Sequence, residues 1–135
     1  MKATIVSDIM TKEVECVTPE QKIVDVKHIY EKGNFHHHIP VTENNKLVGM
    51  ISLIDFMRRI GSANLDDRNA VYQESTVKDI MTFNPQSTSP SATIEEVART
   101  LSSGEFHALP VVEEEMVVGI VTTADLIRHF LDKDS

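Results

Sequence analysis

Two short motifs in this chain place a hydroxyl side chain three residues before an aspartate. Ser52 precedes Asp55, and Thr122 precedes Asp125. A glycine and two apolar residues come before each hydroxyl, so the pattern predicts a strand that ends and a helix that begins. The hydroxyl and the carboxylate can cap the helix by bonding to its free N–H groups. The same groups, at a helix N-terminus, can instead hold the two hydroxyls of a ribose and a phosphate.

The rest of the chain repeats in register with these motifs. The segment Val6-Ser-Asp-Ile-Met-Thr11 returns as Val77-Lys-Asp-Ile-Met-Thr82, an offset of 71 (77 − 6). From Pro40 onward, which matches Pro110, the offset is 70 (110 − 40). Two copies of one supersecondary unit follow, and a copy of roughly 60 residues is marginal alone. We therefore expect the copies to bury apolar faces against each other about a pseudo-two-fold axis, leaving two equivalent crevices.

Each copy reads as strand–helix–strand–strand–helix, so the predicted fold is α/β (α+β), with two β-α-β-β-α repeats in one compact module. Apolar residues at helical spacing and alternating runs give the bounds. Gly33 and Gly104 stand where helices should end. In the first copy we expect an extended piece at 14–18, a helix from Pro19 to Lys32, strands at 36–41 and 47–51, and a helix at 53–60. In the second we expect a helix with a Thr93–Glu96 capping box, strands at 108–112 and 116–121, and a helix at 124–131.

The repeat also predicts how the chain divides. Repeat 1 occupies residues 6–60 and repeat 2 occupies residues 76–131. Between them, residues 61–75 are polar and weakly periodic, which is typical of a linker with at most a helical turn.

Composition narrows the function classes. The formal net charge is −8, with −2 on residues 1–75 (9 Lys+Arg, 11 Asp+Glu) and −6 on residues 76–135 (4 against 10). An acidic chain without a basic stripe is a poor partner for nucleic acid or an anionic membrane. The apolar runs are too short for a transmembrane helix. A single cysteine, Cys16, cannot form an internal disulfide, so we expect a reducing cytoplasm.

The order of the motifs resembles a tandem pair of CBS domains, also called a Bateman module. The features that carry the resemblance are Asp-Ile-Met-Thr, a helix with its glycine, His-Ile-Pro-Val or Ala-Leu-Pro-Val, and Gly-x-x-Ser/Thr-x-x-Asp, each present twice. The resemblance covers about residues 6–131. It implies a stand-alone regulatory module without an attached catalytic domain.

The resemblance implies binding of an adenosine compound: AMP, ADP, ATP or S-adenosylmethionine. In the family the aspartate holds the ribose and the hydroxyl lies near the phosphates, roles that fall here on Asp55 with Ser52 and on Asp125 with Thr122. The base packs against the Asp-Ile-Met-Thr segment of the opposite repeat. The expected adenine pockets therefore include Ile80, Met81 and Thr82 for Asp55, and Ile9, Met10 and Thr11 for Asp125, with Pro40 and Pro110 from the proline motifs. Apolar packing between the repeats is an equal alternative for these segments.

Three consecutive histidines, His36 to His38, precede Pro40. Adjacent strand residues face opposite ways, so one strand cannot direct all three side chains at one tetrahedral metal ion. Packing at a sheet edge is the simplest interpretation. The resemblance adds a third, contact with phosphates, for His37, His38 and His107, and His37 aligns with His107.

Arg58, Arg59 and Arg128 follow the two aspartates by three or four residues. This spacing on a helix favours surface ion pairs with Asp55 or Asp125. Contact of Arg58 and Arg128 with a ligand phosphate is the less favoured alternative.

The sequence thus predicts an adenosine-nucleotide sensor that acts on a separate effector protein, and the resemblance implies a homodimer. We expect no metal, no required cofactor and no enzymatic activity, because no nucleophile stands beside a base and no Gly-rich phosphate loop is present. The alternative is a dimerising scaffold whose Ser/Thr-x-x-Asp motifs only cap helices.

Overall fold

The computed structural model describes residues 3–32 and 37–133. Its internal contacts divide the chain into two compact units. The central unit is Glu15–Asn84, and the terminal unit combines Met1–Val14 with Pro85–Ser135. These boundaries cross the sequence repeat, because the first Asp-Ile-Met-Thr segment lies with the second repeat and the second segment lies with the first.

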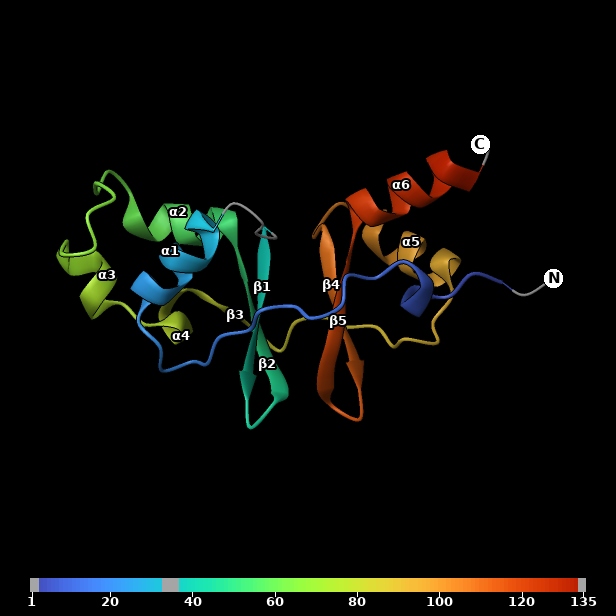
Figure 1. The fold of residues 1–135 in the computed structure, drawn as a ribbon, viewed down its shortest axis with the longest axis horizontal. Helices are drawn as coiled ribbons and strands as arrows, with labels where there is room; N and C mark the ends of the chain where they lie inside the picture. The colour runs from blue at the N-terminus through green and yellow to red at the C-terminus, as the bar shows by residue number, and fades with distance from the viewer. Residues whose placement is uncertain (1–2, 33–36, 134–135) are drawn as a thin grey trace. The chain divides into compact units, whose positions relative to one another are not determined.

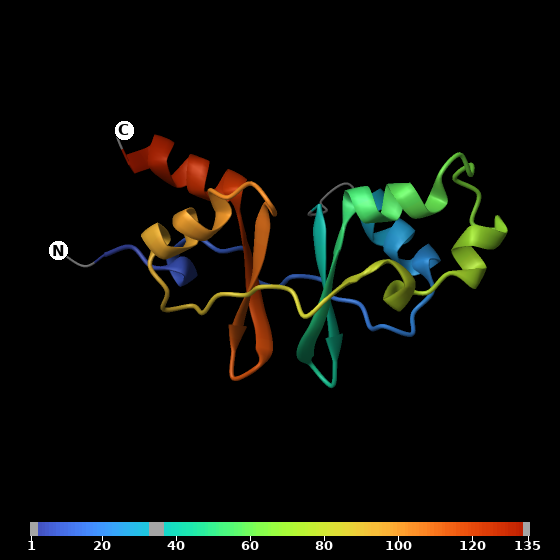
Figure 2. The ribbon, with the colours of Figure 1, turned by 180° about the vertical axis from the view of Figure 1, so that it is seen from behind.

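The central unit holds a β-hairpin with helices beside it (Figures 1 and 2). The hairpin pairs β1 (His38–Glu43) with β2 (Lys46–Ser52), and the short β3 (Thr82–Phe83) pairs antiparallel with β2. The expected strand at 14–18 is reduced to one parallel bridge, between Val17 and Val41. The helices are α1 (Ile23–Glu31), α2 (Leu53–Ile60), α3 (Ala70–Glu74) and α4 (Val77–Ile80).

The terminal unit repeats this arrangement with fewer helices (Figure 1). Its hairpin pairs β4 (Ala108–Glu113) with β5 (Met116–Thr122), and single bridges join Thr11 to Ile120 and Thr88 to Val111. A 3-10 turn, η1 (Val6–Asp8), and the helices α5 (Ile94–Leu101) and α6 (Thr123–Lys133) complete it.

Each unit has its own apolar core, built from one face of each helix and the inward side of the hairpin. In α1 the buried face is the one that the helical spacing predicts. The buried core of the central unit comprises Val17, Ile23, Val26, Ile29, Tyr30, Ile39, Val41, Ile51, Phe56, Tyr72 and Val77. That of the terminal unit comprises Val6, Ile94, Val97, Leu101, Leu109, Val111, Val121 and Leu126.

Each unit contains the Asp-Ile-Met-Thr segment of the other repeat, called here the exchanged segment. Equivalent backbone hydrogen bonds hold the two exchanged segments in their units. Val77 N donates to Gln21 O at 2.8 Å in the central unit. In the terminal unit Val6 N donates to Ala92 O, also at 2.8 Å. Because Val6 and Gln21 each shift by 71 residues to give Val77 and Ala92, the two bonds are the same bond with the repeats interchanged.

Most predicted elements are confirmed, with ends that shift by a few residues. The helix at 53–60 is α2 without change, whereas α6 begins one residue earlier and ends two later than expected. Gly104 ends the α5 region with φ +78°, while Gly33 lies outside the described residues. Thr93 Oγ1 accepts from Glu96 N at 3.1 Å, which is the first of the two bonds of the predicted capping box.

The predicted linker packs against the central unit. Tyr72 of α3 is fully buried, its hydroxyl donates to Asn64 O at 2.6 Å, and its ring stacks on Phe56 with centroids 6.5 Å apart. One aromatic side chain in a polar segment therefore docks the whole stretch onto α1 and α2. No helix within 3–32 and 37–133 is both long and apolar enough to cross a bilayer.

A glycine in each hairpin, Gly49 in β2 and Gly119 in β5, allows the exchanged segment to pack closely against the strand. A Cβ at Gly119 would lie 2.7 Å from Met10 Sδ and 2.8 Å from Thr11 O. A Cβ at Gly49 would lie 2.6 Å from Met81 Sδ and 3.0 Å from the carbonyl oxygen of the following threonine. The methionine can move aside, but the backbone oxygen is fixed by the strand pairing.

We expect Gly119→Ala to lower the free energy of unfolding by about 1–3 kcal/mol, the usual cost of overpacking, as measured by urea denaturation. In a Met10→Ala background Gly119→Ala should cost less than it does in the wild type, since the sulfur contact is gone and only the clash with Thr11 O is left. Gly49→Ala should cost less, because its backbone contact is longer. Wild-type stability in Gly119→Ala would contradict the close approach.

Candidate functional site

The start of α2 carries the first Ser-x-x-Asp motif as a complete capping box. Ser52 Oγ accepts from Asp55 N at 3.0 Å, and Asp55 Oδ2 accepts from Ser52 N at 3.2 Å. The carbonyl of His37 accepts from Leu53 N at 2.7 Å. The capping that the spacing predicts is therefore confirmed at this helix.

The start of α6 is built in the same way. Thr122 Oγ1 accepts from Asp125 N at 3.1 Å, and Asp125 Oδ2 accepts from Thr122 N at 2.8 Å. His107 O accepts from Thr123 N at 2.9 Å. Both units thus fix a carboxylate at a helix N-terminus, where the helix dipole contributes a partial positive charge.

The caps leave one oxygen of each carboxylate for other partners. Within the described residues nothing donates a hydrogen bond to Asp55 Oδ1, whereas Asp125 Oδ1 accepts from Arg128. Tyr30 lies near Asp55, and its hydroxyl donates to His37 O at 3.2 Å. Burial, and then the charge of Asp55, raise the pKa of the Tyr30 phenol above its usual value, so it stays a neutral donor. The helical spacing places Tyr30 on the apolar face of α1, but no sequence pattern assigns it to the site.

The apolar segments expected to contact a base lie in the same units as the carboxylates. Ile80 and Met81 pack against the core of the central unit, which contains Asp55. Ile9 and Met10 pack against the core of the terminal unit, which contains Asp125. This is the pairing that the family resemblance implies, and the apolar packing that was its alternative is also present. Contact with a base stays a prediction.

The remaining residues of the expected pockets belong to the sheet. Thr82 pairs with Met50, and Thr11 bridges to Ile120. Pro40 and Pro110 are buried in β1 and β4, and their carbonyls accept from Val17 N at 3.1 Å and Thr88 N at 3.0 Å.

The histidines lie beside the helix starts. His37 and His107 are exposed, and each gives its carbonyl to the first turn of the following helix. His38 opens β1 opposite Ser52, and His36 lies outside the described residues. Contact of the imidazoles with a phosphate stays a prediction.

The arginines divide between two roles. Arg128 forms an ion pair with Asp125, as the helical spacing favours. Arg59 Nε donates to Ser75 Oγ at 2.9 Å, which ties α2 to the segment before α4. Arg58 is exposed.

Comparison with known proteins identifies the class. The family model described as CBS domain matches residues 6–62 and 77–132. The chain therefore belongs to the CBS domain family, as a tandem pair.

Similar sequences occur in archaea and bacteria. The chain is 36% identical over 130 residues to the protein MJ0188 of Methanocaldococcus jannaschii, covering 95% of the chain and 44% of that protein. It is 27% identical to the CBS domain-containing protein YhcV of Bacillus subtilis, covering 96% of the chain and 88% of YhcV. The chain spans less than half of the length of MJ0188 and of MJ1225, another protein from M. jannaschii. Some relatives are enzymes, such as a homoserine O-acetyltransferase of Methanohalobium evestigatum, of which the chain covers 24%.

Solved structures of CBS pairs match nearly the whole chain. The structure of the CBS pair of MJ0100 with 5′-methylthioadenosine and S-adenosyl-L-methionine matches with a TM-score of 0.81 and 29% identity, covering 98% of this chain and 99% of that one. That of CBSX2 from Arabidopsis thaliana with AMP matches with a TM-score of 0.79 and 27% identity, covering 98% and 99%.

A hollow of about 260 Å³ lies in the central unit, away from the predicted site residues. Its polar walls are paired with each other: Lys32 Nζ donates to Glu15 at 3.0 Å, and Gln21 Nε2 donates to Asp25 at 3.0 Å. Burial, and then the charge of Glu15, raise the pKa of the Cys16 thiol in this wall, so the thiol is kept in its less reactive form.

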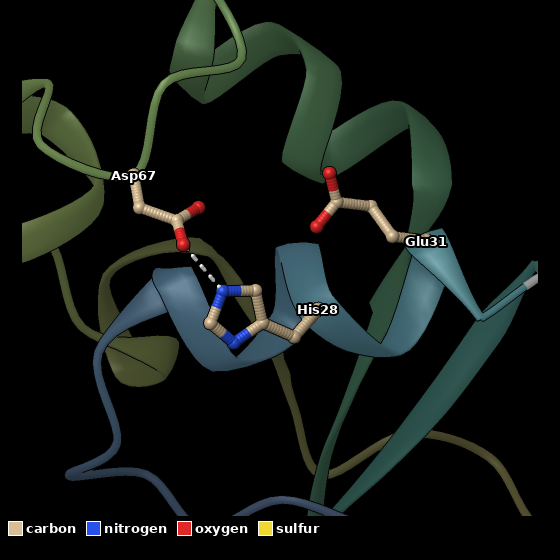
Figure 3. A group of neighbouring side chains, drawn as sticks. All are labelled: His28, Glu31 and Asp67. Atoms are coloured by element: carbon tan, nitrogen blue, oxygen red, sulfur yellow. Dashed lines mark hydrogen bonds and ion pairs between the residues drawn. The ribbon is translucent and has the colours of Figure 1, made fainter.

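Three side chains near this hollow have the donor types of a metal site (Figure 3): His28 and Glu31 of α1, and Asp67 of the segment before α3. Lys27 already balances their charge, since its ammonium lies 2.6 Å from Asp67 Oδ1 and 3.0 Å from Glu31 Oε2. His28 Nε2 lies 2.7 Å from Asp67 Oδ2. A divalent ion would have to sit beside this buried ammonium. The cluster therefore fits a set of ion pairs that holds the segment before α3 to α1, called here the tether, better than a metal centre.

The tether predicts a pH dependence. The bonds from Lys27 and then His28 hold the pKa of the Asp67 carboxyl below its usual range. A lowered pKa in the folded state contributes stability above the unfolded pKa of about 3.9, and this is lost as the pH falls through the folded pKa. We therefore expect Asp67→Asn to lower the melting temperature at neutral pH, by an amount that shrinks below about pH 4.

Thermal unfolding of wild type and Asp67→Asn between neutral and acidic pH measures the difference between their melting temperatures. Glu74→Gln is the matched control, because it removes an exposed carboxylate from α3 in the same segment and should leave the melting temperature unchanged. Equal melting temperatures for Asp67→Asn and wild type at neutral pH would show that the contact does not hold the segment.

Proposed function

We propose that this chain is a regulatory module that binds an adenosine compound at each of its two capped carboxylates. The observation that carries the proposal is the repeated geometry. In both units a helix N-terminus fixes an aspartate, and an apolar segment from the other repeat lies in the same unit. The AMP complex of CBSX2 and the 5′-methylthioadenosine and S-adenosyl-L-methionine complex of MJ0100 support an adenosine ligand.

The parts of such a ligand match the chemistry of each site. The carboxylate oxygen that the cap leaves over can accept from ribose hydroxyls. The helix N-terminus and the neighbouring hydroxyl and imidazole groups of Ser52 and His37, or of Thr122 and His107, suit a phosphate. The apolar segments Ile80–Thr82 and Ile9–Thr11 suit the faces of a base. These roles require binding and no bond-making step, so the module acts as a sensor and not as an enzyme.

A sensor needs a second state that ligand binding can favour. Ligand entry shifts an equilibrium only by its differential affinity for the two states. We place the output on a separate effector protein, in keeping with the regulatory role of the family.

Two helices offer surface for a second copy of the chain. Large apolar side chains are about half exposed or more on α2 and α6: Ile54, Met57, Ile127, Phe130 and Leu131. Apolar side chains repeated on the equivalent helices of both repeats suit a symmetric homodimer. Light scattering should give twice the mass of one chain, and Met57→Glu with Ile127→Glu should reduce it to that of a monomer. A monomeric wild type would overturn this assembly.

The second candidate function is a scaffold with clefts that bind nothing. Both capping boxes are complete without a ligand, which is the observation that favours it. A scaffold predicts that Asp55→Ala and Asp125→Ala cost about 1 kcal/mol of stability each, a typical cap, and have no other effect.

A thermal-shift screen against adenosine and guanosine compounds separates the two functions. A ligand at 100 times its Kd adds about 2.7 kcal/mol per site, which raises the melting temperature by several degrees. We expect an adenosine compound to produce this shift, and Asp55→Ala and Asp125→Ala each to reduce it. If no compound at millimolar concentration changes the melting temperature, and the variants are only less stable than the wild type, the scaffold function is favoured.

A further inference from the structure

The two carboxylates differ in what already occupies them. The side chain of Asp125 is 7% exposed and forms an ion pair with Arg128. Asp55 is half-buried, and no arginine in the described part of the chain forms an ion pair with it. Arg58, at the position equivalent to Arg128 (128 − 70 = 58), is exposed. The oxygen that ribose hydroxyls would need therefore already accepts from an arginine in the terminal unit, whereas in the central unit it accepts from none of the described residues.

A second difference lies one residue beyond the apolar segments. Phe83 follows Thr82, pairs with Gly49 in β3, and is 64% exposed. The equivalent residue after Thr11 is Lys12, also exposed. The central unit thus places an uncovered aromatic ring beside the segment expected to hold a base, where a flat ring can stack. The terminal unit has a lysine, not an aromatic residue, at this position.

We propose that the two sites select ligands of different charge, with Arg128 as the residue that decides. This rests on the proposed function. The central site takes the nucleoside part of a ligand directly, through the open oxygen of Asp55 and the ring of Phe83. The terminal site is closed to a neutral nucleoside by the Arg128–Asp125 pair. It opens to a ligand that carries an anionic group, since that group gives the guanidinium a new partner and releases the carboxylate.

The two ligands differ in whether they can replace the ion pair between Arg128 and Asp125. An uncharged adenosine must compete for Asp125 against a charged donor and leaves Arg128 without its partner. A nucleotide brings the phosphate with the ribose, within the reach of one arginine side chain, so the ion pair is replaced and not lost. The exchange needs no movement of the backbone, because Arg128 is 66% exposed and its side chain can turn on α6.

Isothermal titration with adenosine and AMP tests this on single-site variants of the whole chain. Asp55→Ala leaves the terminal site, and Asp125→Ala leaves the central site. We expect the preference for AMP over adenosine to be larger in Asp55→Ala than in Asp125→Ala. Adding Arg128→Gln to Asp55→Ala should raise the affinity for adenosine about two- to fivefold, the range of an exposed ion pair, and lower that for AMP.

Arg99→Gln in the Asp55→Ala background is the matched control. Arg99 makes an ion pair with Glu95 one turn away on α5, so the variant removes the same charge from the same unit without touching Asp125. It should leave the adenosine affinity unchanged. Urea unfolding confirms that each variant is folded, and Asp55→Asn, which keeps an oxygen for the cap, replaces Asp55→Ala if that variant is not.

The outcomes separate the inference from the proposed function. Equal AMP preference at the two sites, or an Arg128→Gln variant that changes both affinities by the same factor or neither, overturns the charge selection while leaving an adenosine sensor. A terminal site that binds neither probe with or without Arg128 also overturns it. Failure of the wild-type chain to bind either probe at millimolar concentration overturns both.

Discussion

The close packing of each Asp-Ile-Met-Thr segment on a glycine of the other repeat is the contact on which the structure depends. Met81 lies against Gly49 and Met10 against Gly119, and at both glycines the backbone oxygen of the next threonine leaves little room for a Cβ. A copy of about 60 residues buries too little surface to be more than marginally stable by itself. Exchanging this segment completes both cores at once. The same exchange puts the apolar segment and the capped carboxylate into one unit, so the candidate sites are a consequence of how the cores are closed.

Much of this fold could be predicted because its information is local. The bounds of α2 follow from a capping box and a helical spacing that lie within nine residues, and the structure shows both. The exchange of segments is different, because it is a contact between residues about 70 apart, and only the family resemblance implied it. The expected first strand of each copy was wrong in extent. In each copy this segment makes a single parallel bridge, at Val17 and at Thr88. Strand propensity does not predict how many residues of a segment will pair with a neighbouring strand.

The segment at 61–75 shows how composition can mislead. Its polar average indicates a spacer, yet Tyr72 is fully buried and Lys27 is almost so, held by Asp67 from within the segment. A charged residue on the buried face of α1 violates the helical pattern, and it does so because its partner arrives from outside the helix. No local rule pairs Lys27 with a residue 40 positions later. The surface that this segment covers could therefore be found only from the structure.

Helix capping and ligand binding look like rival explanations of the Ser/Thr-x-x-Asp motif, but they use different atoms. The cap engages one carboxylate oxygen, Oδ2, in both units, which holds the side chain in a single orientation. A carboxylate fixed in this way loses little conformational entropy when its second oxygen binds. Capping thus prepares the site and does not compete with it. Competition comes from Arg128, which takes the second oxygen of Asp125. Two motifs that are equivalent in sequence therefore become unequal sites through one ion pair, which Arg128 forms with Asp125 in α6 and which the equivalent Arg58 does not form in α2.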